Sequence, residues 1–115
     1  MQYKGSCHCG QIAFVAEGEL SEVIECNCSI CSKKGALLWR VPATQFRLLT
    51  PATDIGTYTF GQKRIKHHFC PRCGIHLYAE GAGKAGDPLV VVNVRSLEGI
   101  DPSTYPVKHF DGHSL

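Results

Sequence analysis

The residues of this 115-residue chain best suited to chemistry are its seven cysteines, which fall into three closely spaced groups. The groups are Cys7-His8-Cys9, then Cys26-Asn27-Cys28 followed by Cys31, and finally Cys70-Pro71-Arg72-Cys73. Thiolates separated by two or three residues are common ligands of tetrahedral zinc. An odd number of cysteines would leave one unpaired in a disulfide framework, so the pattern favours metal binding.

The strongest local signal is the C-x-x-C turn of Cys70 and Cys73. Such a turn directs two sulfurs at one point, and Gly74 after it is expected to tolerate close approach of the backbone to a metal. A thioredoxin-like redox pair has the same spacing but needs a βαβ context, which the surrounding residues do not indicate. The pair therefore predicts half of a metal site.

The C-x-C pair of Cys7 and Cys9 is expected to supply the other half. In an extended segment, residues i and i+2 face the same side, so both sulfurs can reach one metal. With Cys70 and Cys73 they make a closed set of four thiolates, which suits a structural zinc. Such a zinc would connect the N-terminal segment to a turn about sixty residues later.

The other three cysteines, Cys26, Cys28 and Cys31, are too close together to avoid sharing a metal. A zinc with three protein ligands keeps a fourth position for water or substrate, which is typical of a catalytic site. These three residues are therefore the candidates for an open, catalytic zinc site.

Two other groupings agree with the same spacing. In the first, a histidine completes a second closed site; the candidates are His67, His68 and His76. In the second, Cys70 and Cys73 pair with two of the three cysteines between residues 26 and 31. Spacing alone does not distinguish these alternatives.

The order and spacing of these motifs resemble the glutathione-dependent formaldehyde-activating enzyme (GFA) family, also called the centromere protein V family. The resemblance lies in residues 5–10 (GSCHCG), 26–31 (CNCSIC), 69–74 (FCPRCG) and 109–112 (HFDG), and so covers nearly the whole chain. It implies a mainly β, Mss4-like (β-tent) fold of several small antiparallel sheets stapled by zinc. It also implies two zinc ions, a structural one on Cys7, Cys9, Cys70 and Cys73 and a catalytic one on Cys26, Cys28 and Cys31.

The family's named reaction is the reversible addition of the glutathione thiol to formaldehyde, a carbon–sulfur lyase activity. The resemblance therefore implies a zinc-dependent enzyme that acts on a small thiol adduct. Lys33 and Lys34 follow the open site directly and are candidate contacts for substrate carboxylates. The alternative function is a zinc module that binds a thiol, glutathione or another protein without catalysis.

Two features depart from the family. Residue 27 is Asn where many relatives have His, and the chain is shorter than the founding enzymes. An Asn side chain forms hydrogen bonds but does not carry a proton near neutral pH. If that His has an acid–base role in the relatives, this chain lacks it.

The elements that position the cysteines are expected to be short strands in a single domain over residues 1–115. Runs rich in β-branched and aromatic residues lie at 11–16, 36–41, 45–49, 56–60, 76–79 and 89–94. The last run is the most hydrophobic and is expected at the centre of a sheet. Single helical turns are expected at 29–34, ended by Gly35, and at 95–100. The strand aromatics Tyr58, Phe60, Phe69 and Tyr78 are expected in the core.

The formal net charge of +2 is far below the basic balance of a dedicated nucleic-acid binder, so a nucleic-acid partner is not expected. The first residues lack the apolar region of a signal peptide, and no apolar run is long enough to span a bilayer. We therefore expect a cytoplasmic location. The basic run at 63–68 is expected to be a solvated loop that enters a strand.

Overall fold

The structure, a computed structural model, describes residues 1–62 and 64–114. These residues form ten strands and five short helices, so the expected mainly β fold is confirmed. The strands are β1 (Gln2–Ser6), β2 (Ala13–Glu17), β3 (Val23–Cys26), β4 (Leu38–Pro42), β5 (Phe46–Leu48), β6 (Gly56–Tyr58), β7 (Lys66–Phe69), β8 (His76–Ala82), β9 (Pro88–Asn93) and β10 (Val107–Phe110). The helices are α1 (Cys31–Lys34) and four 3-10 turns, η1 (Ala43–Gln45), η2 (Ala52–Asp54), η3 (Val94–Ser96) and η4 (Pro102–Thr104).

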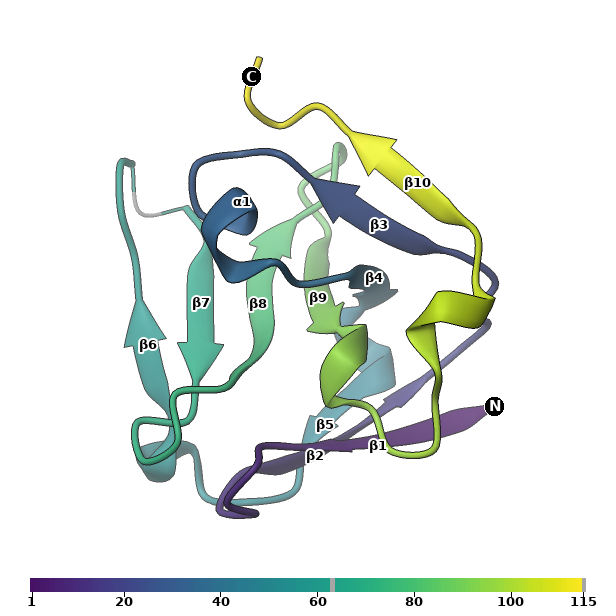
Figure 1. Cartoon of the computed structure of the whole chain (residues 1–115). Coiled ribbons are helices and arrows are strands. Elements are labelled where there is room, and N and C mark those ends of the chain that lie inside the picture. The colour runs from purple at the N-terminus through teal and green to yellow at the C-terminus, as the bar shows by residue number, and fades with distance from the viewer. Residues whose placement is uncertain (63, 115) are drawn as a thin grey trace.

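The strands form two sheets (Figure 1). The small sheet has the order β1-β2-β5, and the large sheet has the order β10-β3-β4-β9-β8-β7-β6. β9 occupies the middle of the large sheet, as its hydrophobic sequence predicts. One pair departs from the antiparallel expectation, because β10 runs parallel to β3, with Phe110 opposite Cys26. That pairing brings the C-terminal strand to the three-cysteine segment.

Aromatic side chains fill the core between the sheets. Phe14 of β2 stacks on Phe46 of β5 at 5.1 Å, and Phe46 lies 4.4 Å from the ring of Tyr78 on β8. Phe14 is completely buried and lies against Gly5 of β1, where a Cβ atom would collide with its ring. The small sheet therefore packs on the large one through aromatic rings that need a glycine opposite them.

Every strand-like run of the sequence contains a strand, and β7 is the strand expected after the basic run. The strands β1, β3 and β10 lie outside the predicted runs. The expectation of four core aromatics is wrong for two of them, because Tyr58 is 52% exposed and Phe60 is 41% exposed. Tyr78 is buried in the core as expected, whereas Phe69 is half-buried. Tyr58 is the last residue of β6 and Phe60 comes two residues later. β6 is an edge strand of the large sheet and, among the described strands, pairs only with β7, which leaves its other side uncovered by a strand. The basic run at 63–68 enters β7 at Lys66, and Lys63 lies outside the described residues.

The helical turn near the cysteines has the expected end. Gly35 has φ 66°, and its N–H donates to the carbonyl of Cys31 at 3.0 Å. The second expected turn is shorter than 95–100, since only η3 forms there. Within the described part of the chain, no helix is long and apolar enough to cross a membrane.

Candidate metal centres

The first cluster joins the two ends of the cysteine pattern. The sulfurs of Cys7, Cys9, Cys70 and Cys73 all lie within 4.8 Å of one another. The Cys9 sulfur is 3.6 Å from that of Cys7 and 3.6 Å from that of Cys70. A tetrahedral zinc with bonds of about 2.3 Å places its sulfurs about 3.8 Å apart. The donor set and its spacing therefore fit a closed zinc site.

Two similar turns present these sulfurs. The N–H of Gly10 donates to the Cys7 carbonyl at 3.2 Å, and the N–H of Gly74 donates to the Cys70 carbonyl at 2.7 Å. The expected extended segment at Cys7 is therefore wrong, because the chain turns after β1. A Cβ atom would meet no described protein atom within 4 Å at either position, so crowding by the protein does not require these glycines. Their tolerance of a nearby metal stays a prediction. Glycine is favoured there because φ is 82° at Gly10 and 80° at Gly74.

Backbone N–H groups surround the first cluster. The N–H of Ile12 donates to the Cys7 sulfur at 3.3 Å, and that of Cys73 donates to the Cys70 sulfur at 3.5 Å. The backbone N–H groups of Cys9 and Ile75 lower the pKa of Cys73 to about 6. These donors favour thiolates, which are the form that binds metal.

The second cluster lies where β3 leads into α1. The sulfurs of Cys26, Cys28 and Cys31 are also within 4.8 Å of one another. Burial, followed by the neighbouring thiols, raises the pKa of Cys31 to about 12. Burial opposes ionisation of Cys28 too, but backbone N–H groups and adjacent thiols lower its pKa. Three sulfurs this close ionise together only beside a cation, so this donor set also fits a zinc ion.

The structure separates the alternative groupings. Cys70 and Cys73 lie with the N-terminal pair, and no histidine or carboxylate of residues 1–62 and 64–114 joins the three-cysteine cluster. His68 lies elsewhere, with Nδ1 2.9 Å from Thr57 Oγ1 and Nε2 3.4 Å from Glu80 Oε1. The second cluster therefore has three protein sulfurs, and a tetrahedral ion would keep one position free.

The other two histidines form a polar group with Lys34. The Lys34 ammonium is 3.3 Å from His67 Nδ1 and 3.2 Å from His76 Nε2. Burial and then the positive charge of Lys34 lower the pKa of His67 to about 4 and that of His76 to about 3. Both imidazoles are thus neutral near pH 7 and accept hydrogen bonds from the ammonium. Lys33 is exposed and takes no part in this group.

A cavity of about 500 Å³ adjoins the second cluster, and all three of its cysteines are among the residues that line it. That volume is within the usual range for small-molecule sites, roughly 300–1,000 Å³. Lys34 and Arg40 are the lysine and arginine of its described lining. The rest is mainly apolar: Ile24, Leu38, Phe60, Ile65, Ala79, Val91 and Phe110 are among its members. Phe60, which the sequence analysis expected in the core, is therefore one of the residues that line this cavity.

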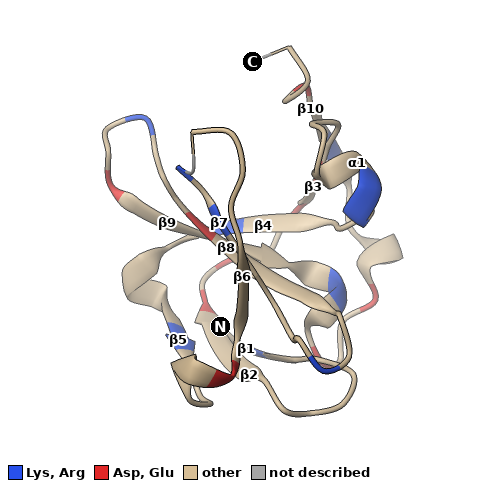
Figure 2. Cartoon of the chain, turned by 90° about the vertical axis from the view of Figure 1, so that its left-hand side faces the viewer, with Lys and Arg blue, Asp and Glu red and all other residues tan. Residues whose placement is uncertain are grey.

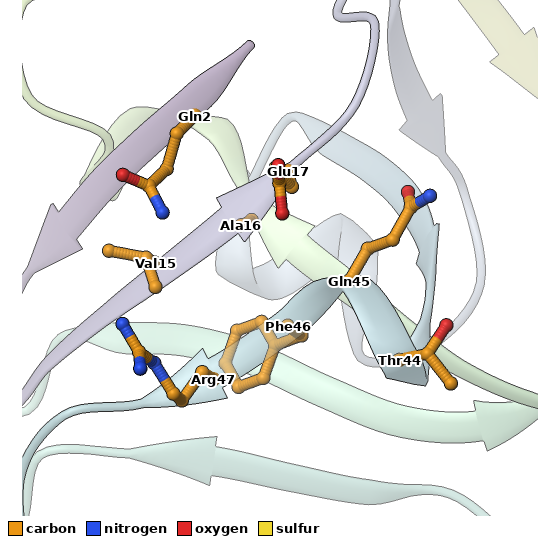
Figure 3. A pocket seen from close by; sticks show the side chains of 8 residues that line it. All are labelled: Gln2, Val15, Ala16, Glu17, Thr44, Gln45, Phe46 and Arg47. Carbon is orange, nitrogen blue, oxygen red and sulfur yellow. The ribbon is translucent and has the colours of Figure 1, made fainter.

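Sequence spacing contains no signal for Lys34 meeting two histidines from β7 and β8. Lys and Arg residues lie on several elements, and two of them, Lys33 and Lys34, follow one another in α1 (Figure 2). Two other hollows, of about 680 and 280 Å³, have no cysteine among the described residues that line them. The smaller of the two lies on β2 and β5, with Arg47 and Gln2 at its edge (Figure 3).

Comparison with known proteins identifies similar chains. A family model described as glutathione-dependent formaldehyde-activating enzyme matches residues 2–110. A crystal structure of a protein from Rhodobacter sphaeroides is 30% identical in sequence, with a TM-score of 0.79. The similarity covers 91% of this chain and 99% of that one. The range matched by the family model contains both cysteine clusters and all strands of the described residues.

Proposed function

The chain belongs to the glutathione-dependent formaldehyde-activating enzyme family, and on that premise we propose that it is a zinc-dependent carbon–sulfur lyase. Its proposed substrate is the adduct of formaldehyde with a small thiol, for which the family name indicates glutathione. One observation carries the proposal: the sulfurs of Cys26, Cys28 and Cys31 form a three-donor cluster, and these three residues line a ligand-sized cavity. The four-cysteine cluster is proposed to hold a second, structural zinc.

The reaction forms one carbon–sulfur bond. The thiol sulfur attacks the carbonyl carbon of formaldehyde, the electrons of the π bond move to the oxygen, and the proton lost by the thiol ends on that oxygen. The reverse reaction breaks the same bond. When bound at the three-cysteine cluster, zinc would favour the thiolate form of a thiol at its free position.

The protein residues of the cavity provide charge and orientation. Lys34 Nζ is held by the two imidazoles, so a fixed ammonium faces negative charge on the attacking sulfur or on the carbonyl oxygen. Because that ammonium is already engaged, Arg40 is the better candidate for a substrate carboxylate. Its guanidinium lies 5.0 Å from the centre of the Phe110 ring and is exposed at the cavity. Carboxylate binding by Lys33 and Lys34 stays a prediction.

The test is the variant Cys28→Ser, with zinc content and adduct formation measured together. The zinc content is expected to fall from two ions per chain to one. The variant should also no longer accelerate the exchange between glutathione and formaldehyde, which is measured by NMR with ¹³C-formaldehyde. Lys84→Met, which changes an exposed residue outside the lining of the cavity, serves as the control and should keep both. A fully active Cys28→Ser protein with two zinc ions would refute the proposal. Glutathione binding without acceleration would support the non-catalytic thiol-binding alternative.

A further inference from the structure

The side chain of Asn27 connects the three-cysteine segment to residues 111–114, which we call the strap. Its Nδ2 donates to Asp111 Oδ1 at 3.0 Å, and its Oδ1 accepts from the backbone N–H of His113 at 2.9 Å. Asp111 is held in turn, since its Oδ2 accepts from Ser114 Oγ at 2.7 Å. One carboxamide thus uses both of its ends on a segment 84 residues away.

The parallel pairing of β10 with β3 brings the strap into reach. The backbone N–H of Asn27 donates to the carbonyl of Phe110 at 3.3 Å, just beyond the last paired residues. The chain then continues past the β3–α1 connection, as the C-terminal end of the trace shows (Figure 1). Asn27 lies between two of the three cysteines, so its hydrogen bonds anchor the strap to the three-cysteine segment itself.

The strap packs directly on the cluster through Gly112. A Cβ atom on Gly112 would lie 2.7 Å from the Cys26 sulfur and 3.1 Å from Cys28 Cβ, both too short for an ordinary contact. Gly112 and His113 line the cavity of about 500 Å³, whereas Asp111 lines a neighbouring hollow of about 350 Å³ that shares Cys26. The strap is therefore part of the wall between these two spaces.

From these contacts we infer that Asn27 is a positioning residue that holds the strap across the three-cysteine cluster and so shapes the thiol cavity. The inference rests on the proposed function only for the identity of the ligand. A carboxamide suits the position because it donates to a carboxylate and accepts from an N–H at once. Residue 27, expected from the sequence to mark a missing proton carrier, is here given a hydrogen-bonding role.

The hydrogen bonds of the strap are exposed to solvent, so its release affects the cavity more than the global stability. When this wall of the cavity is loosened, the affinity for the substrate and that for the transition state fall by the same factor. KM then rises and kcat stays almost unchanged. It also uncovers the three sulfurs, which speeds removal of a bound metal. These two readouts separate positioning from a general effect on folding.

The decisive variant is Asn27→Asp, which removes the donor and puts a second carboxylate against Asp111. We expect zinc transfer from the three-cysteine cluster to the chelator 4-(2-pyridylazo)resorcinol to become roughly tenfold faster, and KM for glutathione to rise by a similar factor. Addition of Asp111→Asn restores a donor–acceptor pair with the roles exchanged. The double variant is expected to return both values to within about twofold of the original.

A second variant reaches the strap from the opposite side. Gly112→Ala puts a methyl group against the Cys26 sulfur and is expected to have the same two effects. Combined with Asn27→Asp it should add little, because both changes release one segment. The matched control is Gly81→Ala, where the new Cβ meets only Ile65 Cγ1 at an ordinary 3.7 Å and neither value should change.

The inference is overturned if Asn27→Asp leaves zinc transfer and amide-proton exchange at His113 as they are, or if Asp111→Asn fails to restore them. Exchange at His113 is measured by NMR on the purified protein and requires neither turnover nor metal. An original protein without lyase activity would refute the proposed function alone. The exchange and zinc-transfer rates would still decide the role of Asn27.

Discussion

The four-cysteine cluster connects distant parts of the chain, and this predicts what removal of one ligand does. Cys9 is exposed, whereas Cys7 and Cys70 are buried. The variant Cys9→Ser therefore removes a sulfur ligand with little loss of packing. Its effect on stability reports the loss of the metal cross-link.

The size of the effect follows from the length of the closed loop. Cys9 and Cys70 are 61 residues apart. The chain-entropy relation for a cross-link of that length gives about 4 kcal/mol at 25 °C. In the three-cysteine cluster Cys26 and Cys31 are only 5 residues apart, for which the same relation gives about 2 kcal/mol. Loss of the first link should therefore cost about twice as much as loss of the second.

The assay is guanidinium denaturation in zinc-containing buffer, followed by fluorescence of Trp39, the single and buried tryptophan. Zinc per chain is measured in parallel by plasma mass spectrometry. Cys9→Ser is expected to lose one zinc ion and about 4 kcal/mol of the free energy of unfolding. Cys28→Ser is the matched control, with one zinc ion lost and about half of that decrease.

Two results would contradict the reasoning. One is a Cys9→Ser protein that keeps two zinc ions, because the cluster would then not be a four-sulfur site. The other is a decrease in stability no larger than that of Cys28→Ser. The first cluster would then contribute no more than a local link, whatever metal it binds.

Three further predictions concern the cavity and the core. Lys34→Met should raise the pKa of His76 by at least about one unit, the effect of a charge 3.2 Å away, and an unchanged NMR titration would count against the polar group. Burial raises the pKa of Tyr78 to about 12, above the unfolded value of about 10, so stability present below pH 10 should be lost as pH rises towards 12. In denaturation experiments at pH 9–12, the free energy of unfolding should fall less in Tyr78→Phe than in the original protein. An equal decrease in both would show that ionisation of Tyr78 is not its cause. Gly5→Ala should cost roughly 1–3 kcal/mol by collision with Phe14, and an unshifted melting temperature would show that the sheets adjust freely.

Local sequence determined the parts of this protein that depend on neighbours in the chain. Within each cysteine group the spacing alone brings sulfurs together, because two or three residues cannot separate them far. Gly35 ends a helical turn because a positive φ is inexpensive only for glycine. The apolar, largely β-branched residues at 89–92 similarly indicated the central strand, in which Val90 and Val92 are buried.

Tertiary structure alone decided how the groups combine. Cys70 meets Cys9 rather than Cys26 because of the order of strands in two sheets, and no local pattern encodes that order. The same holds for the parallel pairing of β3 with β10, which joins segments that are far apart in the sequence.

The polar contacts of the site have the same origin. Lys34 reaches two histidines on other strands, and Asn27 reaches a strap 84 residues away. Such hydrogen bonds leave no periodic signal, because each requires only one suitable side chain at the right place in space. The sequence therefore determined which sulfurs act together locally, and the fold decided what surrounds them.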